Sequence, residues 1–402
     1  MSERTFKKNE ITEGVIWKQL LIFFFPIMLG TLVQQFYTTV DTIIVGRFVG
    51  KAALASVGGP AAVIANIVIT FFNGLANGAA VIIAQYYGSR DEKRLHVGLH
   101  TAYAFSIMTS IAVTVVGVIG TPHFLKWMNT PEDMMADSTI YLRVYFLGII
   151  FTLVYNMGAA IMRAAGDSRR PLLYLVVCSV MNIILDIVMV VFLHMGIAGA
   201  ALATVISQCI SAALVTYSLM HAYDVMKLKL REIRMNMSVL AKELKIGIPG
   251  ALQACAYGVT NVIIQAVVNG FGTDTAAGWA AYGKLDMIFW TVNSALGVAV
   301  TTFVGQNYGA GKMDRVYKSI RVNLGISYLF NGVVLIVLYV FCEPLYHLFT
   351  TDQAVIDIGV YMLRFLVPSY LLSVLLENLT GGLRGLGDVL WPTIFTFAGL
   401  FF

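Results

Sequence analysis

Two stretches of the chain read almost alike, RAAGDSRRP at residues 163–171 and RGLGDVLWP at residues 384–392. Each keeps Arg, Gly, Asp and Pro at the same spacing, and the two stretches lie 221 residues apart. Two further pairs share this offset: Gln85-Tyr-Tyr-Gly88 with Gln306-Asn-Tyr-Gly309, and Leu142-Arg143 with Leu363-Arg364. Agreement of three separate patterns at one offset indicates that the chain contains a duplicated sequence.

The composition excludes soluble protein classes. Of 402 residues, 58% are hydrophobic and only 12% are charged, whereas soluble domains carry about 25% charged residues. The mean hydropathy of +0.78 and long uncharged runs at 20–39, 57–87 and 101–122 are typical of membrane-spanning helices. We therefore predict an all-α integral membrane protein. A soluble enzyme, a disordered protein and a nucleic-acid binder are excluded as primary interpretations.

The apolar runs predict eleven helices. Their expected ranges are 17–46, 57–87, 97–120, 137–161, 171–193, 197–221, 246–270, 278–305, 319–341, 357–382 and one from 392 onward. Six spans in a half is an even number, so the repeats are expected to be parallel, related by an axis along the membrane normal. We expect two six-helix lobes, at 1–222 and 246–402, joined by a basic cytoplasmic linker at 223–245. The complete protein should have twelve spans, with the last ones truncated here.

The basic residues predict the orientation. Of the 27 Lys and Arg residues, 21 fall in the N-terminal segment and in alternate loops of one side. The other six are Arg47, Lys51, Lys126, Arg143, Lys284 and Arg364. By the positive-inside rule, the N-terminus and the basic loops lie in the cytoplasm. We expect a multi-pass protein of the cell membrane whose first helix is retained rather than cleaved as a signal peptide.

Two aspartates lie inside predicted spans of the first half, where an ionisable residue costs about 2.5–3.5 kcal/mol on insertion scales. Gln34 and Tyr37 share a helical face with Asp41. At 1.5 Å per residue, Asp41, Asp186 and Thr204 all lie about 8–11 Å below the outer boundary. The sequence therefore predicts one polar level on the extracytoplasmic side of the first half.

The acidic pair has two interpretations. Two carboxylates in one low-dielectric site resist double ionisation, so they can take up a proton near neutral pH or bind Na⁺ through their oxygens. Alternatively, each aspartate bonds to a polar neighbour, such as Asn182 one turn before Asp186, and only fixes packing. Carboxylates are rare where an amide would serve that purpose. We therefore favour a cation-coupling site of the two aspartates with Asn182 and Thr204.

Other polar residues in the spans are weaker candidates. Pro26 interrupts the first helix and removes a backbone hydrogen bond, so it is either a hinge or a static kink. Glu377 lies in the inner part of the tenth helix, and Asp286 lies near the outer end of the eighth beside Lys284, with which it can pair. The second helix carries a polar stripe that suits a wet cavity or, more conservatively, helix packing: Asn66, Thr70, Asn73 and Asn77.

No pattern indicates a metal, a cofactor or an enzyme. His96 and His100 have a spacing that can hold a metal, but no carboxylate completes an HExxH motif and both lie at a helix start. An interfacial role is therefore favoured for them. The six histidines lie near span ends or in loops, which argues against an intramembrane enzyme. The four cysteines form no CxxC pair and are expected to be buried and unbridged.

Together these patterns resemble the multidrug and toxic compound extrusion (MATE) family of the multidrug/oligosaccharidyl-lipid/polysaccharide flippase superfamily. The resemblance covers the whole chain and rests on the repeat, the paired RxxGDxxxP loops, the GQNYG run at 305–309, and Pro26, Gln34, Tyr37, Asp41 and Val45-Gly46 in the first helix. It implies two lobes that rock between inward-open and outward-open states. It also implies export of cationic, amphipathic compounds in exchange for H⁺ or Na⁺.

The resemblance also assigns residues. The cation-site positions are matched by Asp41, Asn182, Asp186 and Thr204, and the cavity positions by Gln34, Tyr37 and Asn156. Pro26 matches a proline thought to bend with protonation, and Glu377 matches an acid of the tenth helix, counted here among the cavity residues. Another branch relies on a glutamate in the seventh helix. The predicted range 246–270 contains no acidic residue.

We therefore expect a secondary antiporter that exports cationic drugs or metabolites and is not an enzyme. The alternative is a lipid-linked precursor flippase of the same superfamily, which usually needs a wide cationic cavity and extra spans. Few Arg and Lys residues lie inside the spans, which lowers this alternative. The expected partners are small cationic organic substrates, the coupling ion and membrane lipid, with no nucleic acid and no cofactor. We expect a monomer.

Overall fold

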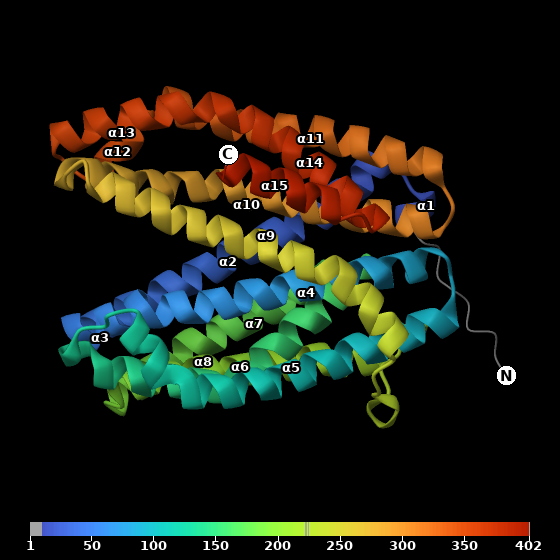
Figure 1. The fold of residues 1–402 in the computed structure, drawn as a ribbon, viewed down its shortest axis with the longest axis horizontal. Coiled ribbons are helices and arrows are strands. Elements are labelled where there is room, and N and C mark those ends of the chain that lie inside the picture. The colour runs from blue at the N-terminus through green and yellow to red at the C-terminus, as the bar shows by residue number, and fades with distance from the viewer. Residues whose placement is uncertain (1–9, 222, 224, 402) are drawn as a thin grey trace.

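A computed structural model describes residues 10–221, 223 and 225–401, and these residues form helices without strands. The helices lie in two bundles along one long axis, with α3–α8 in the first, α9–α15 in the second, and α2 in contact with both (Figure 1). The bounds are α1 Glu10–Glu13, α2 Ile16–Phe48, α3 Lys51–Ser56, η1 Val57–Ala61, α4 Ala62–Gly88, α5 Glu92–Trp127, α6 Glu132–Ala164, α7 Arg169–Asp186, η2 Ile187–Phe192, α8 Gly196–His221, η3 Leu230–Glu232, α9 Met237–Asn269, α10 Thr273–Gly309, α11 Met313–Val340, α12 Cys342–His347, α13 Gln353–Leu366, η4 Val367–Ser369, α14 Tyr370–Leu386 and α15 Leu390–Phe401.

The predicted all-α membrane fold is confirmed. Within the described ranges, ten helical stretches are long and apolar enough to cross a membrane. The eleventh predicted helix begins at Leu390 as the 12-residue α15. Most helices begin a few residues before their predicted start, because hydropathy marks only the apolar part of a helix. For example, α5 begins at Glu92, where Oδ1 of Asp91 accepts a hydrogen bond from the backbone N–H of Arg94 (2.9 Å).

The seventh spanning helix differs most from its predicted range. Instead of starting at 246, α9 begins at Met237, where Oδ1 of Asn236 caps the helix by accepting from the N–H groups of Ser238 (3.1 Å) and Val239 (3.2 Å). Its first turns are basic and amphipathic, so they carry no apolar signal. These turns include Glu243, and the prediction of a seventh helix without an acidic residue was therefore wrong.

The two RxxGDxxxP loops have the same backbone geometry. Gly166 and Gly387 adopt φ values of +91° and +92°, which favour glycine, and each ends the preceding helix. In each loop the glycine N–H donates to the carbonyl of the motif arginine at 2.9 Å. Each loop therefore ends one helix shortly before the next begins. The repeat seen in the sequence is thus a repeat in conformation.

We call the end of the molecule that carries the loops at 89–91, 165–168, 225–236, 310–312 and 387–389 the basic end. There the bundles are joined by two hydrogen bonds that the repeat relates. Nε2 of Gln306 donates to the carbonyl of Ala164 (2.6 Å), and Nε2 of Gln85 donates to the carbonyl of Gly385 (3.0 Å). The two donors are 221 residues apart in the sequence, and so are the two acceptors, which is the offset of the repeat. The two copies of the sequence therefore bind each other.

Small residues allow the backbones of α4 and α9 to touch across this contact. A Cβ added at Gly78 would lie 2.4 Å from the backbone nitrogen of Gly247, and one added at Gly74 would lie 2.4 Å from Cα of Ala251. Both pairs are spaced by four residues along their helices. Such small-xxx-small pairs are a common way for membrane helices to approach closely. This contact is a large part of what holds the bundles together.

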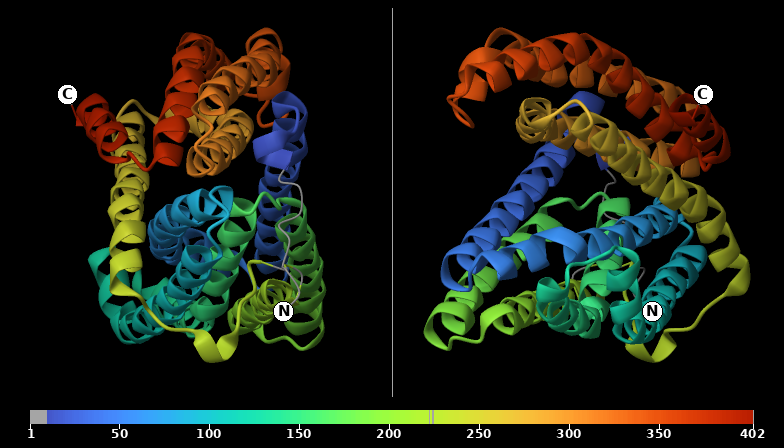
Figure 2. Two further views of the ribbon diagram at one scale, coloured as in Figure 1. Left: turned by 90° about the vertical axis from the view of Figure 1, so that its right-hand side faces the viewer. Right: turned by 60° about the vertical axis from the view of Figure 1, so that its left-hand side comes forward.

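The helix α2 belongs to both bundles (Figure 2, where it is blue). Its first turns pack on the second bundle, where the ring of Phe23 lies 6.0 Å from that of Phe303 and Phe24 lies 5.4 Å from Phe330. Further along, Gly30 faces Leu175 of α7 in the first bundle. Pro26 lies between these two segments, inside a continuous helix.

Candidate functional site

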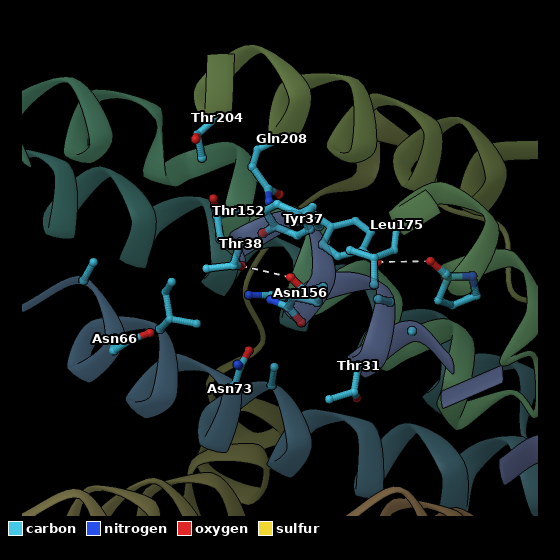
Figure 3. A pocket seen from close by; sticks show the side chains of 18 of the residues that line it. Thr31, Tyr37, Thr38, Asn66, Asn73, Thr152, Asn156, Leu175, Thr204 and Gln208 are labelled. Atoms are coloured by element: carbon cyan, nitrogen blue, oxygen red, sulfur yellow. Dashed lines mark hydrogen bonds between the residues drawn. The ribbon is translucent and has the colours of Figure 1, made fainter. Parts of the chain in front are cut away.

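A cavity of about 450 Å³ lies beside α2 in the first bundle. Its walls come from α2, α4, α6, α7 and α8, and the second bundle contributes only the α10 residues Ser294, Ala295 and Val298. The volume is in the range of small-molecule binding sites. Figure 3 shows polar side chains of α2, α4, α6 and α8 facing this space.

Most of the predicted site residues line the cavity: Pro26, Gln34, Tyr37, Asp41, Asn156 and Thr204. In Figure 3, Tyr37, Thr38 and Asn156 lie close together, near Gln208 of α8. The polar stripe of α4 also faces the cavity through Asn66, Asn73 and Asn77. This stripe therefore suits a wet cavity, the less conservative of its two interpretations.

The two aspartates lie near each other, one on the cavity wall and one behind it. Asp41 lines the cavity, whereas Asp186 and Asn182 are 0% and 1% exposed and lie outside its lining. The carboxyl groups of Asp41 and Asp186 lie close enough to act on each other electrostatically. Oδ1 of Asp41 and both oxygens of Asp186 have no hydrogen-bond partner among the described residues.

This arrangement can bind a proton or a cation. A buried carboxylate without a partner is too costly to remain ionised, and it becomes neutral or recruits a cation instead. The side-chain atoms of Asn182 and Oε1 of Gln208 are buried and also without partners in the described chain. Oxygen ligands of this kind suit a hard cation such as Na⁺. Thr204 lies on the cavity wall, and its hydroxyl donates to the carbonyl of Ala200 (3.1 Å).

Two features of this site were not predicted from the sequence. The helix α7 ends at Asp186 and continues as the π-helical η2, and single π-helical turns are frequent at functional sites. Tyr141 and Tyr145 of α6 are buried in the cavity wall, and Tyr141 lies within electrostatic reach of both aspartates. The i, i+4 spacing of the tyrosines could have identified them. No sequence signal marks the π-helix.

Charged groups elsewhere in the spans fall outside the acidic site. Arg163 lines the cavity on the side of the basic end, which the sequence did not predict. Glu377 does not line the cavity, because it lies on the face of α14 that packs on α10. A Cβ added at Gly297 of α10 would lie 2.4 Å from Oε1 of Glu377. Asp286 accepts a hydrogen bond from the hydroxyl of Tyr370 instead of pairing with Lys284, which is exposed.

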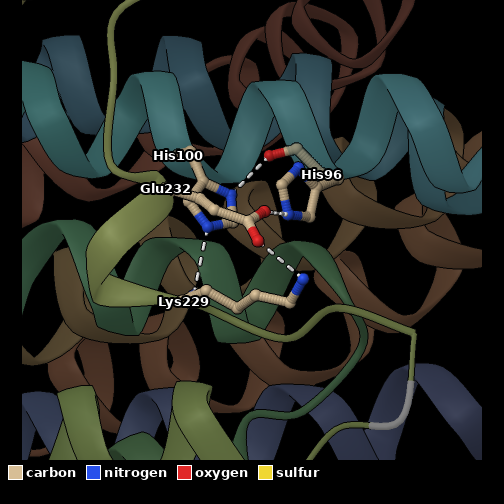
Figure 4. A network of polar contacts seen from close by, with 4 residues as sticks. All are labelled: His96, His100, Lys229 and Glu232. Atoms are coloured by element: carbon tan, nitrogen blue, oxygen red, sulfur yellow. Dashed lines mark hydrogen bonds and ion pairs between the residues drawn. The ribbon is translucent and has the colours of Figure 1, made fainter.

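The histidine pair anchors the segment between the bundles (Figure 4). Nδ1 of His100 lies 2.7 Å from the carbonyl of His96, and its Nε2 accepts from the backbone N–H of Lys229 (3.1 Å). Glu232 pairs with Nε2 of His96 (2.9 Å) and with Nζ of Lys229 (2.7 Å). One atom from each of His96, His100 and Glu232 lies within 4.8 Å of the others. Because Nε2 of His100 is engaged by Lys229, the geometry supports an interfacial role rather than a metal site.

Comparison with known proteins identifies the family. The MatE family model matches residues 26–188 and 249–402, which is most of the chain. The chain belongs to the MatE family. The resemblance to MATE transporters seen in the sequence is therefore confirmed.

Relatives match this MatE protein over nearly its full length. The probable multidrug resistance protein YoeA of Bacillus subtilis (strain 168) is 30% identical over 389 residues, covering 94% of this chain and 83% of YoeA. The multidrug export protein MepA of Staphylococcus aureus (strain N315) is 24% identical over 385 residues, covering 94% and 84%. A crystal structure of a MATE protein in the straight conformation matches the fold with a TM-score of 0.90, 22% identity and coverage of 99% and 88%.

Proposed function

We propose that this MatE protein is a secondary active antiporter that exports cationic amphipathic drugs or metabolites in exchange for H⁺ or Na⁺. The observation that carries the proposal is the acidic pair formed by Asp41, on the wall of a cavity of small-molecule size, and the buried Asp186 behind it. The names of YoeA and MepA as multidrug proteins support it. A lipid flippase is not favoured, since the charged lining residues in the described chain are Asp41 and Arg163 alone.

The orientation follows from the basic loops. With the basic end in the cytoplasm, the N-terminus is also on the cytoplasmic side of the cell membrane, although residues 1–9 lie outside the described residues. The hydrogen bonds that Gln85 and Gln306 make between the bundles then close the cytoplasmic side, and the acidic pair lies toward the outer side. This is the state in which an exporter exchanges substrate for the driving ion.

Charge neutralisation would couple the ion to the substrate. When Asp41 and Asp186 are ionised, their negative charge favours a cationic substrate in the cavity. When a proton or Na⁺ neutralises the pair, this attraction is lost and the substrate leaves. The bundles then rock against each other, with Pro26 as the hinge in the helix that joins them. The ion and the substrate thus compete for the negative charge of the acidic pair.

The test is transport of a cationic dye by the full chain in proteoliposomes, with a pH gradient and a sodium gradient imposed separately. Asp41→Asn should abolish ion-driven dye export while the protein still inserts. Asp314→Asn, which alters an exposed acid in the first turn of α11, should export at the original rate. Full ion-driven export by Asp41→Asn would refute the assignment, and the effective gradient identifies the coupling ion.

A further inference from the structure

Another acidic residue is buried far from the coupling site. Glu243 on α9 is 2% exposed, and neither of its carboxyl oxygens has a hydrogen-bond partner within the described chain. Six residues separate it from the start of the helix at Met237, or about 9 Å at 1.5 Å per residue. It therefore lies near the basic end, where the proposed transport cycle assigns it no role.

Glu243 is buried by the contact between the two bundles. A Cβ added at Gly78 of α4 would lie 2.4 Å from the nitrogen of Gly247 and 2.6 Å from the carbonyl oxygen of Glu243. The helix α9 thus presents this turn directly to α4. Lys242 and Lys245 on the same helix are exposed on its other face. Separation of the bundles at the basic end would bring water to the carboxyl group.

No cation compensates the carboxyl group in the closed contact. From α4, the phenol of Tyr86 lies within electrostatic reach. At the start of α5, the capping residue Asp91 and Arg94 of the first turn act on Tyr86 and pair with each other at 3.3 Å. The described part of α15 carries no titratable residue, and the acidic and basic residues of α10 lie in its first four turns, away from the basic end. Among the described residues, Glu243 forms no ion pair.

We propose that Glu243 is a proton-binding site of the closed basic-end contact. An ionised carboxylate that is buried without a partner is too costly to form, so the group holds a proton while α4 and α9 touch. When the helices separate, the O–H bond of the carboxyl breaks and the proton passes to water on the basic side. On closure the same bond forms again with a proton from that side.

The consequence is a dependence on the pH of one compartment. This inference rests on the proposed function only in requiring that the bundles separate at the basic end. The proton returns to the side it came from, so it is not transported and does not change the coupling ratio. Instead, the ratio of closed to open protein falls by up to about tenfold for each unit of pH increase on that side, as expected for one linked proton.

Infrared spectroscopy tests the protonation state without any transport. The full chain in lipid nanodiscs at neutral pH should show a protonated-carboxyl band that Glu243→Gln removes, even when Asp41 and Asp186 are both replaced by Asn. Glu343→Gln, at an exposed position of α12, should leave the band unchanged. A spectrum that is the same with Glu243 or Gln at this position would overturn the proposal.

A distance measurement tests the coupling to opening. Spin labels at Ser89→Cys and Met313→Cys, both exposed on opposite bundles at the basic end, should move apart as the pH rises, in the background lacking Asp41 and Asp186. Glu243→Gln should stay closed and lose the tenfold dependence per pH unit. Glu243→Met is a second neutral variant of similar size in case the amide does not fold. An unchanged pH dependence in these variants would refute the site while leaving ion-driven export intact.

Discussion

Replacing Gly88 with alanine should force the bundles apart at the basic end. A Cβ at Gly88 would lie 2.0 Å from the carbonyl oxygen of Gln306, and side-chain Cβ atoms essentially never come within 3.0 Å of another atom. The helix ends must therefore separate by at least about 1 Å, because the obstructing atom is backbone rather than a flexible side chain. Gly309 has the same relation to the carbonyl of Gln85, also at 2.0 Å.

The magnitude follows from the two hydrogen bonds that the shift would break. The bond from Gln306 to Ala164 measures 2.6 Å, and the bond from Gln85 to Gly385 measures 3.0 Å. An extra 1 Å lengthens both to about 3.6 Å or more, beyond hydrogen-bonding distance. At about 1 kcal/mol each, their loss destabilises the closed form by about 2 kcal/mol. This corresponds to about a 30-fold fall in the ratio of closed to open molecules.

The assay is the distance between spin labels on the loops at 89–91 and 310–312, measured in nanodiscs. Gly88→Ala and Gly309→Ala should broaden the distribution toward longer distances to the same extent, since the repeat relates their contacts. Gly325→Ala is the control, because nothing lies within 4 Å of a Cβ at this position of α11. A closed fraction in Gly88→Ala equal to that of the control would refute the steric role of Gly88 in this contact.

Two further predictions concern the linker and the second bundle. The ammonium of Lys229 lowers the pKa of Glu232, so their contact is present at neutral pH and is lost as the pH falls through the lowered pKa. In Glu232→Gln, hydrogen exchange should show less protection of the backbone amide of Lys229. Equal protection in the variant and the original protein would contradict this prediction. Tyr370→Phe removes the hydroxyl that donates to Asp286 and should lower the free energy of unfolding by about 1–3 kcal/mol in thermal unfolding in detergent. Tyr328→Phe, at a more exposed hydroxyl, should change it little.

The repeat and the helices could be predicted because their signals are local. The glycine of each RxxGDxxxP loop determines a turn by its own φ angle, so Gly166 and Gly387 could be assigned as helix ends from the sequence alone. The common depth of Asp41 and Asp186 followed from the helical rise, and the structure brings the two carboxyl groups together. Their role in ion coupling stays a prediction, since proximity alone does not measure transport.

The remaining features depend on contacts between distant segments. Hydropathy missed Glu243 because the first turns of α9 are polar on one face and buried on the other only once α4 packs against them. The partner of His96 is Glu232, which lies in another segment and carries no motif. The orientation of Glu377 toward α10 depends on the rotation of α14, and a single apolar run does not specify that rotation.

Because α2 packs on both bundles, it couples their movements mechanically. Phe23 and Phe24 anchor one arm on the second bundle, while Asp41 lies on the other arm in the first. A rigid rod held at both sides cannot follow two moving bodies, so any relative displacement must appear as bending near Pro26 or as sliding of the turn that carries Asp41. Movement of the two bundles would therefore displace the acidic pair directly through α2, without intervening side chains.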